Sequence, residues 1–103
     1  MLFIGFFEYN ANDSDKVIEK FTQIMAERQM GAERFAKLIF GPYHYSGENK
    51  GFGVYETDDP EKLMSLNVFY TPLLKWNFVP LVDSRKAVEL WVKLRLLPKS
   101  SIP

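Results

Sequence analysis

The chain has 103 residues, of which 47% are hydrophobic and 16% aromatic, enough for one packed core and too few for a second domain. Thirteen basic residues balance thirteen acidic ones, so no net field attracts nucleic acid or an anionic membrane. The chain contains no cysteine, which excludes disulfides, thiolate nucleophiles, zinc knuckles and iron–sulfur clusters.

The N-terminal segment predicts a strand rather than a targeting signal. Residues 1–9, MLFIGFFEY, are rich in Phe and apolar at both parities until Glu8, which is typical of a strand buried on both faces. They lack the basic residues and the cleavage site of a signal peptide, and no apolar run in the chain reaches the ~18 residues of a membrane span. We therefore expect a cytoplasmic protein with no membrane partner, folded as a single domain over residues 1–97 with a flexible tail at 98–103.

A first helix is predicted after the turn-forming residues 10–14, with Gly31 as its stop. Asp13 and Asp15 lie at its N-terminal end, where negative charge interacts favourably with the helix dipole. The apolar positions follow the spacing i, i+1, i+4, i+7, i+8 of one helix face. This stripe consists of Val17, Ile18, Phe21, Ile24 and Met25, and Arg28 completes it.

A β-hairpin is predicted over residues 37–57, KLIFGPYHYSGENKGFGVYET, with its turn at residues 46–50. Pro42 cannot donate a hydrogen bond to a neighbouring strand, so the first hairpin strand should be an edge strand or bulged near Gly41. On the return strand, Gly51 and Gly53 lie two residues apart. Their spacing predicts a hollow on one face of the sheet, where both positions lack side chains.

The second half repeats the order helix then strand. Asp59 is the predicted N-cap of a helix whose first residue is Pro60, and Pro72 ends that helix. Residues 73–82, LLKWNFVPLV, form a fourth strand, and Pro80 again favours an edge position. A last helix begins at residues 83–84, runs to about residue 96 and is apolar nearly all round.

This order predicts an α+β, ferredoxin-like fold: a split β-α-β arrangement with a four-stranded antiparallel sheet, two helices on one face and an extra C-terminal helix. The other sheet face would be apolar and bare, which is unusual for a soluble monomer. The simplest cover is a second copy of the same sheet related by a two-fold axis. We therefore expect a homodimer.

The segments MLFIGFF, FGPYHYSGENKGFGVYETDDPEKL and FVPLVDSRKAVEL resemble a small family of the dimeric α/β-barrel superfamily. The likeness covers residues 1–90, most specifically the pattern G-x-x-x-x-E-x-D-D-P-E at residues 51–61. Family members carry Trp-His-Asp near the hairpin, where this chain has Tyr43-His44-Tyr45. The resemblance implies a dimeric α/β barrel, in a superfamily that includes cofactor-free monooxygenases, isomerases, haem enzymes and proteins with no known activity.

His44 is the only histidine and the candidate catalytic residue, because histidine titrates near neutral pH and can act as an acid or base. The alternative is a structural histidine at the end of a strand, bonded to a tyrosine or a carbonyl group. One histidine without cysteine cannot form a histidine metal cluster, so we expect no metal and no cofactor. Polar and aromatic residues could line a cleft for a flat organic ligand, or else pack in the core and the dimer interface. These are Tyr9, Asn10, Tyr43, Tyr45, Tyr55, Trp76 and Asn77.

Two functions remain open from the sequence, and whether the chain is an enzyme is undecided. The first is a homodimer that binds a small organic ligand or acts as a cofactor-free, monooxygenase-like enzyme with His44 as acid or base. The second is a non-catalytic dimerising module that acts through protein contacts. Nucleic acid is not an expected partner, because the aromatic strands carry no basic stripe.

Overall fold

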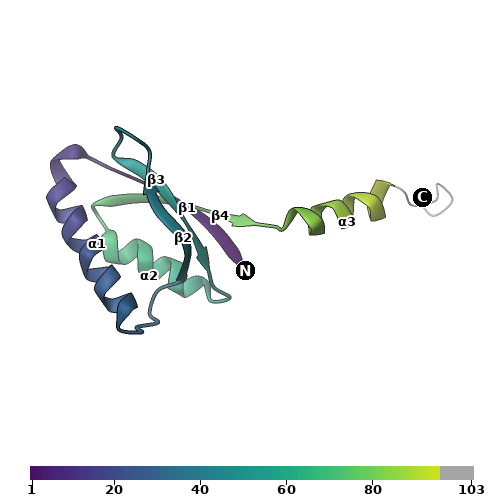
Figure 1. Cartoon of the computed structure of the whole chain (residues 1–103), viewed down its shortest axis with the longest axis horizontal. Helices are drawn as coiled ribbons and strands as arrows, with labels where there is room; N and C mark the ends of the chain where they lie inside the picture. Colours follow the sequence, from purple (N-terminus) through teal and green to yellow (C-terminus); the bar gives the residue numbers. More distant parts are fainter. Residues whose placement is uncertain (96–103) are drawn as a thin grey trace.

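Four antiparallel strands form one sheet in the order β2-β3-β1-β4, with α1 and α2 on one of its faces (Figure 1). This computed structural model describes residues 1–95 of the chain. The prediction of a ferredoxin-like fold with an extra C-terminal helix is confirmed. The elements are β1 (Leu2–Tyr9), the 3-10 helix η1 (Ala11–Asp13), α1 (Ser14–Gln29), β2 (Lys37–His44), β3 (Lys50–Glu56), α2 (Pro60–Tyr70), β4 (Leu74–Leu81) and α3 (Ser84–Arg95).

Both edge strands are the ones that contain proline, as predicted. Pro42 lies in β2 and Pro80 in β4, and neither strand has a neighbour on its outer side. The pairing of β2 with β3 also shifts register between Leu38 and Phe40 and again between Phe40 and Tyr43. The bulged edge follows from the missing backbone donor at Pro42.

The two helices that cover the sheet begin and end near the predicted residues. At the start of α2 the Asp59 side chain accepts a hydrogen bond of 2.9 Å from the backbone N–H of Glu61, and Pro60 is the first helical residue. The helix α1 ends at Gln29, and Gly31 follows in the left-handed region with φ of +82°. Its N-cap residue Asp13 makes no side-chain capping bond.

The hydrophobic core lies between the sheet and these two helices. Its central side chain, Leu66 of α2, is 1% exposed. The core side of the sheet is set by alternation along the strands, because Phe7 of β1 pairs with Trp76 of β4 and both face the helices. The buried members are Phe7, Val17, Ile24, Phe35, Ala36, Tyr55, Leu63, Leu66, Tyr70 and Leu74.

The hollow predicted at Gly51 and Gly53 is absent, because neighbouring groups fill the space above both glycines. A Cβ atom at Gly53 would lie 2.8 Å from the hydroxyl oxygen of Tyr55. A Cβ atom at Gly51 would collide with the backbone carbonyl oxygen of Tyr43. The glycines therefore admit an aromatic side chain and a close backbone approach rather than leaving empty volume.

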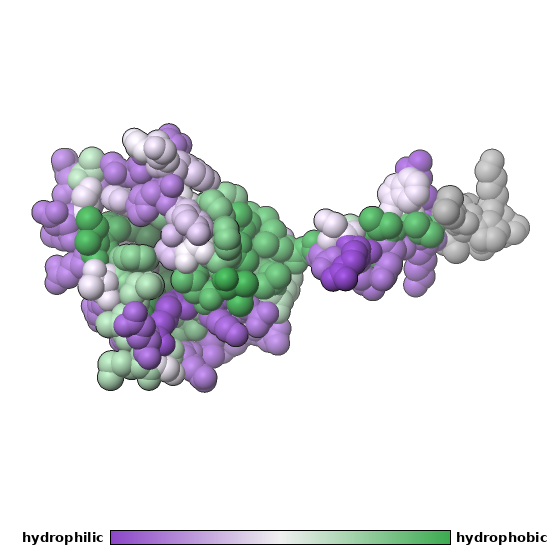
Figure 2. Space-filling view, in the orientation of Figure 1, coloured by the Kyte–Doolittle hydropathy of each residue, from purple (hydrophilic) through white to green (hydrophobic). Residues whose placement is uncertain are grey.

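The opposite face of the sheet is apolar and carries no helix in the described part of the chain. Cross-strand pairs such as Ile4 with Val54 and Phe6 with Phe52 lie on it. Phe40 and Tyr43 of β2 are 52% and 54% exposed, and both rings pack beside that of Phe52. We call this the open face; its residues are Leu2, Ile4, Phe6, Phe40, Tyr43, Phe52, Val54, Val79 and Leu81. Figure 2 shows hydrophobic residues gathered on the side of the body that is turned toward α3.

The helix α3 projects away from the body, and every residue of it is exposed (Figure 1). It is amphipathic rather than apolar nearly all round, which corrects the sequence interpretation. Its polar side holds Arg85, Lys86, Glu89 and Lys93, while Ala87, Val88, Leu90, Trp91, Val92 and Leu94 occupy the rest. The predicted tail at 98–103 and the last two residues of the predicted domain lie outside the described residues.

No helix among residues 1–95 combines the length and the apolar character needed to cross a membrane.

Candidate functional site

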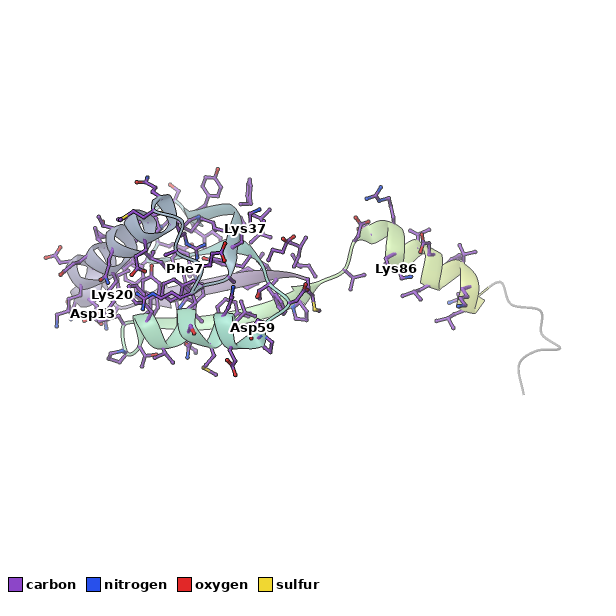
Figure 3. The ribbon with its side chains drawn as sticks, turned by 90° about the horizontal axis from the view of Figure 1, so that it is seen from below. Phe7, Asp13, Lys20, Lys37, Asp59 and Lys86 are labelled. Carbon is purple, nitrogen blue, oxygen red and sulfur yellow. The ribbon has the colours of Figure 1, made fainter. Side chains whose placement is uncertain are left out.

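A cleft of about 290 Å³ lies between α1 and the core side of the sheet. It exists because only Val17 and Ile24 of the α1 stripe are buried, whereas Ile18 and Phe21 remain 57% and 38% exposed. The body is hollowed beside α1, with hydrophobic residues around the opening (Figure 2). Phe7, at its base, lies between α1 and α2 in Figure 3. The walls consist of Phe7, Tyr9, Val17, Ile18, Phe21, Ile24, Met25, Arg28, Leu38, Pro42, His44, Tyr55, Leu66, Tyr70, Leu74 and Trp76.

His44 and Tyr9 form a hydrogen-bonded pair at one end of this cleft. The Tyr9 hydroxyl oxygen and His44 Nε2 lie 2.8 Å apart, and which of the two donates depends on the imidazole tautomer. The His44 ring also packs edge-on against the Phe7 ring, with centroids 5.1 Å apart. This contact spans β3, because Gly51 pairs with both Phe7 and His44 and places no side chain between them.

Arg28, Tyr55 and Tyr70 gather at the other end. The Arg28 guanidinium lies over the Tyr55 ring, 5.9 Å from its centroid, and its Nη1 donates a hydrogen bond of 2.7 Å to the carbonyl oxygen of Ala36. Burial lowers the pKa of Arg28, although a guanidinium keeps its charge in proteins. Burial raises the pKa of Tyr55 to about 12 and raises the pKa of Tyr70 as well. Both phenols are therefore neutral at pH 7 and able to donate a hydrogen bond.

Trp76 adds a polar group without a partner. Its Nε1 atom is buried and makes no hydrogen bond to any described residue. The indole also lies on the wall of the cleft, and its ring is 6.0 Å from that of Tyr55 and 5.9 Å from that of Tyr70. An unpaired buried donor is costly in a folded protein and is often explained by a missing ligand or water.

The structure brings together four of the eight residues that the sequence indicated. His44, Tyr9, Tyr55 and Trp76 all line the cleft. Asn10 lies outside it and caps η1, where its side chain accepts a hydrogen bond of 3.0 Å from the backbone N–H of Asn12.

The other three residues are on the opposite side of the sheet. The rings of Tyr43 and Tyr45 each lie 6.3 Å from the ring of Phe52, and Asn77 pairs with Phe6 on the open face. The predicted cleft residues thus divide between two surfaces, because alternate residues of a strand face opposite sides of the sheet.

Sequence reasoning missed Arg28 and Tyr70 as cleft residues. The signal for Arg28 was its place in the apolar stripe of α1, where a charged side chain needs a partner or a ligand. Tyr70 is the last residue of α2, and the sequence gives no hint that this side chain lines a cavity.

The lining of the cleft contains one arginine, one histidine and no carboxylate. Among residues 1–95, no three His, Asp or Glu side chains gather closely enough to hold a metal ion. The cleft can therefore offer an apolar wall, hydrogen-bond donors at one end and a histidine–tyrosine pair at the other.

Comparisons with known proteins give the family of the chain. The chain matches no curated protein and no solved structure at a significant level. One protein family, described as "Domain of unknown function (DUF3303)", matches residues 1–95. Because this match spans nearly the whole chain, the chain belongs to the DUF3303 family.

Proposed function

We propose that this protein binds a small, largely apolar organic molecule in the cleft between α1 and the sheet. The observation that carries the proposal is a cavity of about 290 Å³ with aromatic and aliphatic walls and a few convergent polar groups. This volume is at the small end of the ~300–1,000 Å³ typical of ligand pockets. The same combination of an apolar cavity and a few polar groups is the usual form of a binding site for organic molecules.

The histidine–tyrosine pair gives this site an acid–base group. His44 reaches the cleft at its exposed end, and its imidazole can accept a proton from a bound ligand while Tyr9 holds the ring in place. We propose, from its resemblance, that the chain belongs to the dimeric α/β-barrel superfamily, where cofactor-free monooxygenases occur.

The test is a thermal-shift and titration screen of the purified chain with flat aromatic compounds. A ligand present at 100 times its dissociation constant stabilises the folded state by about 2.7 kcal/mol, which raises Tm by roughly 10 °C or more for a domain of this size. Met25→Trp narrows the cleft and should abolish the shift. Gln23→Trp adds the same bulk to an exposed position of the same helix outside the cleft and should leave the shift intact. Equal responses of both variants would contradict binding in this cleft.

The role of His44 is tested by His44→Asn, which keeps hydrogen-bonding capacity and removes the acid–base group. If His44 exchanges a proton with the ligand, this variant should fold normally and lose turnover or the pH dependence of binding. If His44 is structural, the variant should lose about 1 kcal/mol of stability and bind ligand as before.

A second function, assembly through protein contacts, is favoured by the open face and by α3. Phe40 and Tyr43 of the open face are 52% and 54% exposed, and Trp91 of α3 is 55% exposed. Large apolar side chains that are exposed together are typical of protein–protein contact surfaces. We propose that two copies stack their open faces and that each α3 lies against the partner with its apolar side.

Light scattering of the 12.0 kDa chain should then give twice that mass at micromolar concentration. Phe40→Glu places a charge on the open face and should shift the protein toward monomer, because an unpaired charge in an apolar interface is costly. Gln23→Glu adds the same charge to an exposed position on α1 and should leave the mass unchanged. A wild-type protein that is monomeric at every concentration would remove the dimer proposal.

A further inference from the structure

The permanent charge on the lining of the cleft is of one sign only. Its walls contain a single permanently charged side chain, Arg28, and no Asp or Glu from any described residue. All other lining groups except His44 and the tyrosine hydroxyls are apolar side chains or indole. A ligand that enters this cleft therefore meets positive charge and no negative charge.

Arg28 has no counterion among residues 1–95. No carboxylate lies within 4 Å of its guanidinium, and its one hydrogen bond to protein, from Nη1 to the carbonyl oxygen of Ala36, uses one of five N–H donors. By contrast, Arg34 and Arg85 each pair with a carboxylate at the surface. A half-buried arginine without a carboxylate partner is costly unless a ligand supplies the negative charge.

Two buried tyrosines line the cleft together with Arg28, and the guanidinium lies 5.9 Å from the ring centroid of one of them, Tyr55. Tyr55 and Tyr70 are each 4% exposed and line the cleft, and neither hydroxyl makes a hydrogen bond to a described residue. The buried indole N–H of Trp76, whose ring lies 6.0 Å from that of Tyr55 and 5.9 Å from that of Tyr70, is a third donor without a partner. A guanidinium with unused N–H donors, in a cleft that also holds unpaired hydroxyl donors, matches the oxygen atoms of a carboxylate, which accept hydrogen bonds in two directions.

The shape of the cleft fixes where the rest of the ligand lies. The lining residues of α1 run from Val17 to Arg28, a span of roughly 16 Å along the helix. Tyr9 and His44 lie near the first of these, because β1 leads through Asn10 and η1 directly into α1. The apolar walls occupy the length between the two polar ends.

We propose that the ligand of this cleft is an apolar monocarboxylic acid. Its carboxylate binds Arg28 with the hydroxyls of Tyr55 and Tyr70, and its hydrocarbon body extends toward the His44–Tyr9 pair. This inference rests on the proposed ligand-binding function and adds the chemical class of the ligand and its orientation. It also gives the two polar ends of the cleft different roles: Arg28 binds the carboxylate of the ligand, and His44 is the acid or base at the other end of the ligand.

The test uses pairs of probes that differ only in charge: 4-phenylbutanoate against 4-phenylbutanamide, and 2-naphthoate against 2-naphthamide. Calorimetric titration and ligand-observed NMR on the full chain should give at least about tenfold tighter binding of each acid than of its amide, as expected for hydrogen bonds to a charged group. Arg28→Gln should reduce this preference to about twofold or less, because the loss of the charge weakens binding of the acid far more than binding of the amide. Arg34→Gln removes a paired surface arginine and should leave the preference intact.

Each outcome separates the inference from the function on which it rests. Acid and amide that bind the wild-type protein equally would overturn the carboxylate assignment and leave ligand binding standing. If the wild-type protein binds none of the four probes and no compound of the aromatic screen, both the carboxylate assignment and the ligand-binding function are wrong. If Arg28→Gln does not fold without its bond to Ala36, Arg28→Lys replaces it; this variant keeps the charge and should retain a reduced preference for the acid. An unchanged preference in Arg28→Gln would contradict the role of Arg28.

Discussion

The contact between Gly53 and Tyr55 predicts that a single methyl group destabilises the domain. A Cβ atom built at Gly53 lies 2.8 Å from the Tyr55 hydroxyl oxygen and 3.0 Å from two of its ring carbons. Tyr55 has little room to move, because it is 4% exposed and packs edge-on against Trp76 and Phe78 at 6.0 and 6.2 Å. Gly53→Ala should therefore cost about 1–3 kcal/mol, the usual range for overpacking a core.

The assay is urea or thermal unfolding. For a domain of 60–100 residues each 1 kcal/mol lowers Tm by about 4–8 °C, so Gly53→Ala should lower it by at least about 4 °C. Because the displaced group includes the hydroxyl oxygen, Gly53→Ala should cost less in a Tyr55→Phe background. The coupling between the two positions should lie between about 0.5 and 3 kcal/mol, as for other residues in contact.

The opposite result has a clear meaning. A Gly53→Ala protein with unchanged Tm would show that the space above the glycines is empty, as their spacing in the sequence suggests. Additive effects of Gly53→Ala and Tyr55→Phe would show that the hydroxyl of Tyr55 lies elsewhere.

Three further predictions concern the helices. Asp59→Ala removes the acceptor for the backbone N–H of Glu61 and should cost about 1 kcal/mol, measured as a lower Tm; an unchanged melting curve would place the start of α2 elsewhere. At the start of α3, the Asp83 carboxylate accepts hydrogen bonds from the backbone N–H and the side chain of Arg85, and these bonds lower the pKa of Asp83. This capping interaction stabilises α3 above the ordinary pKa of aspartate, and the stabilisation is lost as the pH falls through the lowered pKa. As the pH is lowered, the amide NMR signals of α3 should therefore lose helical character before those of the sheet. If the α3 signals stay helical down to the pH at which the sheet unfolds, this prediction is wrong. Trp91→Lys replaces an apolar side chain of α3 that is 55% exposed and should weaken the proposed dimer without lowering the Tm of the monomer; an unchanged dissociation constant in analytical ultracentrifugation would exclude α3 from the interface.

Most of the fold could be predicted from the sequence because its signals are local. Pro42 and Pro80 lack a backbone N–H, and this alone assigns both strands to the edges of the sheet. Asp59 and Pro60 similarly define the start of α2, since a capping side chain and a fixed φ act within one turn.

The cleft could be predicted only in part because it depends on the distance between α1 and the sheet. The parity of β1 and β4 indicates that Tyr9 and Trp76 share a face, but not that α1 leaves Phe21 partly uncovered beside them. The spacing of Gly51 and Gly53 predicts empty volume at the wrong place. It shows which side chains are missing from the sheet face but not which neighbouring groups occupy the space above them. The sequence pattern places Arg28 in the helix stripe, because such a pattern cannot distinguish a solvated arginine from one without a counterion.

The two tryptophans of the chain lie at the two surfaces proposed to bind other molecules: the cleft, proposed for the ligand, and α3, proposed for the dimer interface. Trp76 is on the wall of the cleft with its indole N–H unpaired, and Trp91 is exposed on α3, far along the chain from the core. Indole fluorescence responds to polarity and hydrogen bonding around the ring, so the protein carries two built-in optical reporters. In Trp91→Phe the remaining emission reports occupancy of the cleft, and in Trp76→Phe it reports whether α3 is covered. Titrating each single-tryptophan protein would show whether filling the cleft changes the environment of α3, using no added label.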